Sequence, residues 1–140
     1  MTNRPMSEIL RNQVPLTLAP EATVQEACRQ MHARGVGAVL VTDPKGGLLG
    51  IFTGRDAVHM LARARDPAGT PLRHVMTRHP HTLPPGCTAI EALRLMHDGG
   101  FRHVPVVRDG VVIGVVSRGD FRGLEQDRLD EETGLWERIA

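Results

Sequence analysis

Two short phrases in this chain combine a hydroxyl with a carboxylate at a spacing that could do chemistry. Gly50-Ile-Phe-Thr-Gly-Arg-Asp56 and Gly114-Val-Val-Ser-Arg-Gly-Asp120 share the pattern G-h-h-[T/S]-x-x-D, where h is an apolar residue. A hydroxyl can donate to a phosphate, and an aspartate can accept from the two hydroxyls of a ribose. Each phrase is expected to leave a strand and open a helix, where free amides and the helix dipole favour an anion.

The same spacing also has a purely structural explanation. Thr53 with Asp56, and Ser117 with Asp120, fit the cap and third positions of a helix, whose free amides they would satisfy. Spacing alone favours this capping role. One set of residues can serve both roles, so the phrases remain candidate binding sites.

Each of the two phrases closes one copy of a tandem repeat. The stretch from Pro15 to Asp43 matches the stretch from Pro80 to Arg108 at 13 of 29 positions, whereas roughly two matches would arise by chance. A repeat of about 65 residues buries too little surface to be stable alone, so the two units are expected to share a core.

The stretch 66–71 is rich in proline and glycine and is predicted to be the linker between the units. This divides the chain into unit 1 (1–66, with an N-terminal lead), unit 2 (67–128) and a C-terminal tail (129–140). The short apolar leads before the two repeats, residues 6–10 and 72–76, are expected to dock on the sheet. The tail carries Trp136, which is expected to pack on a neighbouring segment or on a second chain.

Each unit is predicted to run in the order helix, strand, strand, helix, which indicates a mixed α/β (α+β) fold. Thr23 with Glu26, and Thr88 with Glu91, are predicted to be capping boxes, and the helices that they open are predicted to end at glycine. The second helices are expected directly after the two phrases, the later one including Phe121 and Leu124. Strands are predicted over 38–42, 48–52, 104–107 and 111–116.

Composition argues against several classes of function. Seventeen basic and sixteen acidic residues leave a net charge of +1 without any basic tract, so nucleic acid is not an expected partner. No apolar run approaches the length of a membrane span, and no signal core is visible at the N-terminus. Cys28 and Cys87 form no CxxC pair, which favours a reducing compartment. A cytoplasmic protein is expected.

His79 and His81 are candidate metal ligands, because an extended segment can point both side chains the same way. No Cys, Asp or Glu stands at ligand spacing beside them. We therefore expect surface histidines and no metal site.

The ordered set of features resembles the CBS domain, named after cystathionine beta-synthase. The resemblance rests on the duplication, the order of elements, the two G-h-h-[T/S]-x-x-D phrases and the strand-opening proline of His103-Val-Pro-Val-Val107. It covers residues from about 6 to about 128. No single motif is specific, but the ordered set occurs twice, as in the tandem pair called a Bateman module.

In that family, each unit has a small β-sheet with two helices on one face. The two units pack through their sheets around a pseudo-twofold axis and leave two clefts. The clefts bind adenosine ligands such as AMP, ADP, ATP, NAD or S-adenosylmethionine, and such modules usually sense and regulate.

Carried over residue by residue, the resemblance implies that Asp56 and Asp120 accept from a ribose and that Thr53 and Ser117 face a phosphate. The starts of the first strands would line the adenine side of the cleft that the other unit's aspartate completes. These starts are Val36-Gly37-Ala38 and Phe101-Arg102-His103.

The resemblance also implies that the two clefts are unequal. Arg102 and His103 could reach the phosphates of a ligand held by Asp120, whereas Gly37 and Ala38 stand at the matching places of unit 1. There the charge would have to come from Arg55 or from another element. The Asp120 cleft is therefore expected to bind phosphate better, unless Arg102 and His103 simply form a solvated strand edge.

The leading hypothesis is a free-standing regulatory module that binds an adenine nucleotide, AMP or ATP foremost, with no other cofactor. It would form a homodimer, a disc of four units, and signal occupancy to a separate, unidentified protein. One alternative is an interaction scaffold with empty clefts. Another is an enzyme, but no nucleophile and base pair and no complete metal-ligand set can be assembled from the motifs.

Overall fold

The computed structural model describes residues 4–10 and 13–121. Leu124 and the predicted tail (129–140) with Trp136 lie outside the described residues. Phe121 was predicted in the second helix of unit 2, but there the chain forms only the short 3-10 helix Arg118–Asp120, and Phe121 itself has an extended backbone (φ −97°, ψ 142°). The elements are α1 (Met6–Ile9), β1 (Thr17–Leu18), α2 (Val24–Arg34), β2 (Ala38–Thr42), β3 (Leu48–Thr53), α3 (Gly54–Ala62), η1 (Leu72–His74), β4 (Thr77–Arg78), α4 (Ala89–Gly99), β5 (His103–Arg108), β6 (Val111–Ser117) and η2 (Arg118–Asp120).

The two long helices begin and end where the capping signals predict. The Thr88 hydroxyl and the Glu91 carboxylate each accept from the other residue's main-chain amide. At α2 only half of the predicted box forms: Thr23 accepts from the amide of Glu26, but the Glu26 carboxylate accepts instead from Arg29 and Gln30. Both helices end at a left-handed glycine. None of the helices in the described part is long and apolar enough to cross a membrane.

The strands form two antiparallel hairpins, as predicted. β2 pairs with β3 inside a four-stranded sheet of order β1-β2-β3-β4, and β5 pairs with β6. Asp109 and Gly110 both have positive φ, 50° and 80°. This is the backbone conformation of a two-residue turn whose twist matches the flanking strands.

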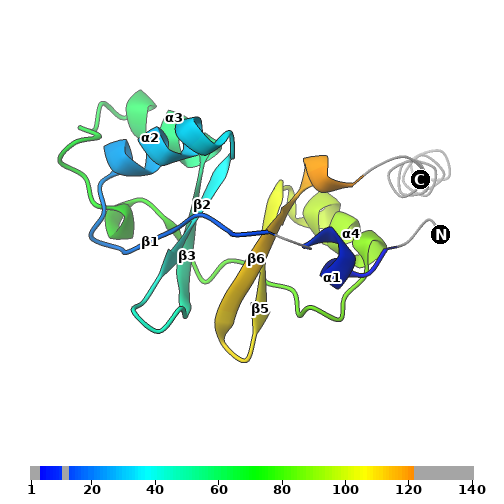
Figure 1. Cartoon of the computed structure of the whole chain (residues 1–140). Helices are drawn as coiled ribbons and strands as arrows, with labels where there is room; N and C mark the ends of the chain where they lie inside the picture. The colour runs from blue at the N-terminus through cyan, green and yellow to red at the C-terminus, as the bar shows by residue number, and fades with distance from the viewer. Residues whose placement is uncertain (1–3, 11–12, 122–140) are drawn as a thin grey trace, which may run out of the picture.

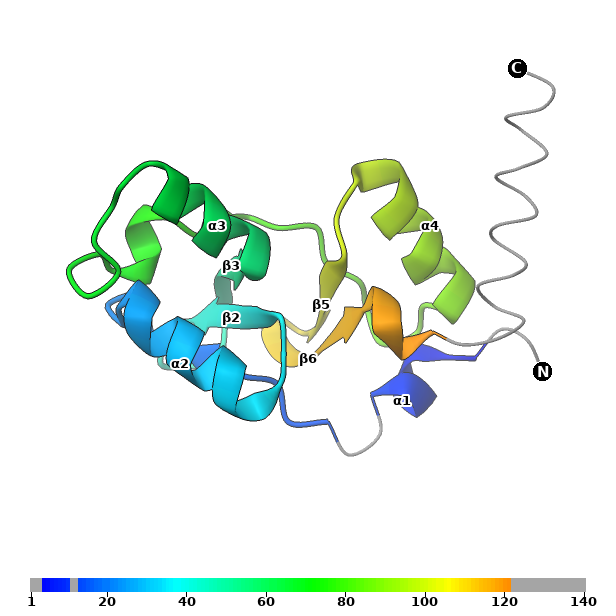
Figure 2. The ribbon, with the colours of Figure 1, turned by 90° about the horizontal axis from the view of Figure 1, so that it is seen from above.

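The two sheets face each other at the centre, with the helices outside. Figures 1 and 2 show the strands between α2 and α3 on one side and α4 on the other. Val39 and Val41 of β2 pack with the helices of unit 1. Ala38 and Leu40, one residue out of phase, pack with β6. Because neighbouring residues of a strand point to opposite faces, one strand serves both the unit's own core and the contact between units. Packing through the sheets is thereby confirmed.

The leads cross between the units. Met6 of α1 is fully buried in the core of unit 2, and Figure 1 shows α1 beside α4. Leu72 is fully buried in the core of unit 1. Equivalent hydrogen bonds hold them, from the Met6 amide to the Cys87 carbonyl (2.9 Å) and from the Leu72 amide to the Ala22 carbonyl (2.8 Å). The N-terminal lead therefore precedes unit 1 in sequence but packs on unit 2.

The glycine that opens each phrase makes room for a crossing lead. A Cβ atom at Gly50 would lie 2.7 Å from the Met76 sulfur and 2.8 Å from the Thr77 carbonyl oxygen. A Cβ atom at Gly114 would lie 2.7 Å from a Leu10 methyl group and 2.8 Å from the Gln13 amide oxygen. These contacts are shorter than packed atoms tolerate, so glycine at both positions is explained by the crossing.

Candidate functional site

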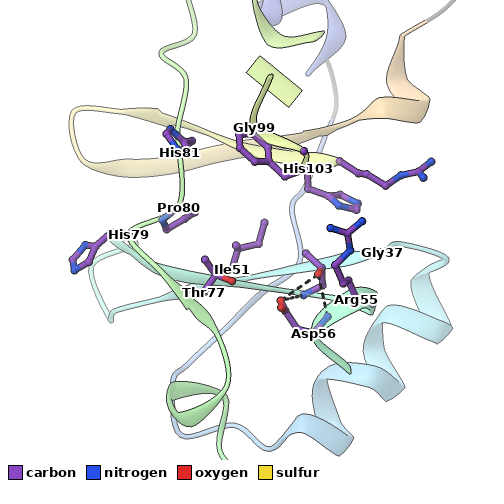
Figure 3. A pocket seen from close by; sticks show the side chains of 15 residues that line it. Gly37, Ile51, Arg55, Asp56, Thr77, His79, Pro80, His81, Gly99 and His103 are labelled. Carbon is purple, nitrogen blue, oxygen red and sulfur yellow. Dashed lines mark hydrogen bonds between the residues drawn. The ribbon is translucent and has the colours of Figure 1, made fainter. Parts of the chain in front are cut away.

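The first phrase turns the end of β3 into the start of α3. Asp56 Oδ2 accepts from the Thr53 amide (2.9 Å) and from the Thr53 hydroxyl (3.2 Å). The Asp56 amide in turn donates to that hydroxyl (3.4 Å), as the dashed lines of Figure 3 show. The predicted capping role is confirmed here.

The second phrase repeats this geometry at the end of β6. Asp120 Oδ2 accepts from the Ser117 amide (2.7 Å) and hydroxyl (3.2 Å). In the part of the chain that the structure describes, Oδ1 of Asp56 and Oδ1 of Asp120 have no hydrogen-bond partner. Since a carboxylate oxygen can accept further bonds, both aspartates cap their turns and still keep an oxygen for a ligand.

A cleft of about 670 Å³, here named the Asp56 cleft, lies where the first phrase meets unit 2. Its volume is within the range of small-molecule sites. Figure 3 shows Asp56 and His81 on opposite walls of it. The lining residues are Gly37, Ile51, Thr53, Gly54, Arg55, Asp56, Thr77, His79, Pro80, His81, Gly99, Gly100, Phe101, Arg102 and His103.

A second cleft of about 430 Å³, here named the Asp120 cleft, lies where the second phrase meets unit 1. It is the pseudo-symmetric counterpart of the first, because most of its lining residues are the repeat equivalents of residues in the Asp56 cleft. They are Gln13, Val14, Pro15, Leu16, Arg34, Gly35, Val36, Gly37, Ala38, His103, Val115, Ser117 and Asp120.

The structure brings the predicted site residues together in the crossed arrangement. Thr53, Arg55 and Asp56 share a cleft with Phe101, Arg102 and His103 of unit 2. Ser117 and Asp120 share the other with Val36, Gly37 and Ala38 of unit 1. Each aspartate thus faces the strand start of the other unit. That these residues bind a ligand stays a prediction.

Arg102 lies in the Asp56 cleft, as the crossed arrangement predicts, but not in the Asp120 cleft, which it was also expected to reach. The reason is local: consecutive strand residues point to opposite sides, so it is His103, and not Arg102, that lines both clefts. Its ring lies 3.2 Å from where a Gly37 Cβ would stand.

His103 lines both clefts. Burial lowers the pKa of its imidazole below the ordinary value of 6.5, the Arg102 charge lowers it further, and the Asp120 carboxylate opposes both. A neutral imidazole is therefore favoured near neutral pH.

Several cleft residues were not predicted from the sequence. His79 and His81 line the Asp56 cleft, and the ring of His81 stacks on that of Phe101 with centroids 5.3 Å apart and planes at 17°. Their repeat equivalents, Val14 and Leu16, line the other cleft. Once one of these pairs is known to line a cleft, the repeat alignment identifies the other pair as its equivalent. Within the described residues, no group of three possible metal ligands occurs.

The family model of the CBS domain matches residues 6–63 and 72–126. A curated relative, the CBS domain-containing protein CBSCBSPB2 of Arabidopsis thaliana, is 44% identical over 108 residues, which are 76% of this chain and 20% of that protein. The chain spans about a fifth of the length of the curated relatives that match first.

Two solved structures share the fold. The CBS domain protein PAE2072 from Pyrobaculum aerophilum, complexed with AMP, superposes with a TM-score of 0.81 at 24% identity, over 91% of this chain and 98% of that one. The CBS domain pair of protein MJ0100, in complex with 5′-methylthioadenosine and S-adenosyl-L-methionine, has a TM-score of 0.76 at 25% identity, over 83% and 94% of the two chains.

Proposed function

Because this chain belongs to the CBS domain family, we propose that it is a regulatory module that binds an adenosine ligand between its two units. The observation that carries this proposal is the crossed composition of the clefts. In each, an aspartate at a strand-to-helix turn of one unit faces the first strand of the other. Relatives of the same fold have been solved with AMP, and with 5′-methylthioadenosine and S-adenosyl-L-methionine.

In this proposal the open Oδ1 of Asp56 or Asp120 accepts from the ribose hydroxyls. Charge-assisted hydrogen bonds of this kind are among the stronger ones in proteins. The Thr53 or Ser117 hydroxyl and the turn amides face the phosphate side, and the other unit's strand start faces the adenine. AMP and ATP are the ligands we expect first.

A ligand that touches both units can shift how they sit together, but only by its difference in affinity for the two arrangements. We propose that a regulated protein senses this shift. We assign no catalytic role, because the carboxylates of Asp56 and Asp120 lie in separate clefts. Nucleotide turnover that disappeared in Asp120→Ala would contradict this assignment.

We also propose a homodimer in which α3 contributes to the contact. Val58 and Leu61 on this helix are 67% and 60% exposed, so their apolar surface is available to a second copy. Sedimentation velocity is the test. A monomer at every concentration, with or without ligand, would contradict the dimer.

Titration calorimetry with AMP, ATP, NAD and S-adenosylmethionine tests the binding proposal. We expect heat from at least one ligand and a loss of about tenfold in affinity for Asp56→Asn or Asp120→Asn. Asparagine keeps an oxygen that can cap the turn but removes the charge. The absence of heat and of any thermal shift with all four ligands would favour the alternative, an interaction scaffold with empty clefts.

A further inference from the structure

The walls of the two clefts differ at positions that the repeat makes equivalent. His79, His81, Phe101 and Arg102 line the Asp56 cleft. Val14, Leu16, Val36 and Gly37 stand at the matching places of the Asp120 cleft. The first wall is aromatic and basic, whereas the second is aliphatic.

Two arginine side chains that could bind an anion line the Asp56 cleft. Arg55 and Arg102 are both exposed and line it from opposite units. Neither guanidinium has a hydrogen-bond or ion-pair partner among the described residues. Among the described lining residues, Asp56 carries the only carboxylate. Two arginines from different units could therefore close on one anionic group, each with several N–H donors.

The Asp120 cleft offers an anion much less. Among the described residues, Arg34 is the one arginine or lysine in its lining, and its guanidinium already donates to the main-chain carbonyl of Val14. His103 also lines this cleft, and the burial of its ring disfavours the charged form. The cleft is also smaller, about 430 Å³ against about 670 Å³. A chain of phosphates would meet the carboxylate of Asp120 with little positive charge to offset it.

We infer that the two clefts divide adenosine ligands by charge: the Asp56 cleft takes an adenosine di- or triphosphate, and the Asp120 cleft takes an adenosine ligand without a negatively charged group. This rests on the proposed function, that the clefts bind adenosine ligands at all. It reverses the order expected from the sequence, because Arg102 lies on the Asp56 side.

The test compares ADP with adenosine by titration calorimetry. The double variant Arg55→Gln/Arg102→Gln removes the two charges from the Asp56 cleft, and Arg34→Gln is the matched control in the other cleft. We expect the double variant to weaken ADP by about tenfold or more while adenosine changes by less than about twofold. Arg34→Gln should weaken ADP by less than about threefold. Added salt should weaken ADP more than adenosine.

The outcomes separate the inference from its premise. If ADP and adenosine both bind, but the double variant weakens ADP no more than Arg34→Gln does, the division by charge is wrong and the proposed function stands. If the double variant weakens adenosine as much as ADP, the arginines do not act on phosphate and the inference is again wrong. If neither compound binds the unaltered protein, the proposed function falls and the inference with it. Retained adenosine binding shows that a variant is folded.

Discussion

The two clefts share one backbone frame but carry different side chains. In unit 1 the Gly54 amide donates to the Gly37 carbonyl (3.2 Å), and at the equivalent place in unit 2 the Arg118 amide donates to the Arg102 carbonyl (3.0 Å). Both aspartates hold their turns through Oδ2. The residues in which the two repeats agree therefore build the frame, and those in which they differ decide what each cleft can hold.

The largest expected difference concerns the glycines under the crossing leads. Gly50→Ala places a methyl group 2.8 Å from the Thr77 carbonyl oxygen, which β4 holds against β3. In Gly114→Ala the methyl group meets the ends of the Leu10 and Gln13 side chains, which can move. We expect Gly50→Ala to lower the free energy of unfolding by about 2–3 kcal/mol and Gly114→Ala by about 1 kcal/mol.

Urea denaturation of both variants measures this difference. The Gln13 amide oxygen accepts from the Val115 amide (2.6 Å). Part of the loss of stability in Gly114→Ala should therefore come from disturbing that hydrogen bond. Equal losses of unfolding free energy would mean that the two crossings are equally rigid. The predicted structural difference between the two units would then be wrong.

A smaller effect is expected from the aromatic wall. Phe101→Val gives the Asp56 cleft the residue that Val36 supplies to the other cleft, and it removes the ring that stacks on His81. An aromatic stacking contact contributes about 1 kcal/mol, so an adenosine ligand in this cleft should bind about fivefold more weakly. Calorimetry checks this, with Val36→Ala as the matched control. If both variants weaken binding equally, the aromatic wall adds nothing to recognition.

The smallest expected effect is on the pKa of His103, which can be followed by NMR. Arg102→Gln should raise this pKa, because it removes a nearby positive charge, and Asp120→Asn should lower it further. Shifts of the pKa in opposite directions would show that charged residues of both clefts act on the His103 ring. No change in either variant would mean that burial alone sets its pKa.

The same pKa has a consequence for stability. Since the folded protein holds the imidazole of His103 below its ordinary pKa of 6.5, the unfolded chain binds this proton more tightly. Stability should then fall as the pH drops through about 6.5 and below. Denaturation at pH 7.5 and at pH 5.5 measures this. Between these two pH values, the free energy of unfolding of His103→Gln should fall less than that of the unaltered protein.

Local signals predicted most of the fold. The caps at Thr23 and Thr88, the turn at Asp109-Gly110 and the alternating strands depend on neighbours within a few residues. The crossed pairing of each aspartate with the other unit's strand start came from the family resemblance, and the clefts bring those residues together.

The crossing of the leads could not be predicted, because an apolar segment such as 6–10 or 72–76 fits either core by composition. The cleft roles of His79 and His81 followed from that crossing, since the segment that carries them reaches the first phrase only when β4 pairs with β3. Whether Arg102 also reaches the Asp120 cleft depended on the direction of one side chain, which changes with a shift of one residue along the strand. These are long-range or single-residue choices that spacing in the sequence does not encode.

The crossed leads also set the order in which the chain can fold. The core of unit 1 needs Leu72, and the core of unit 2 needs Met6. During synthesis the first core can close only after the start of the second repeat has emerged. Met6 precedes the first repeat, but its core partners, such as Leu93 and Val104, belong to the second repeat and are made later. Such distant pairings slow folding and tie both halves to one cooperative transition, so neither repeat is an independent folding unit.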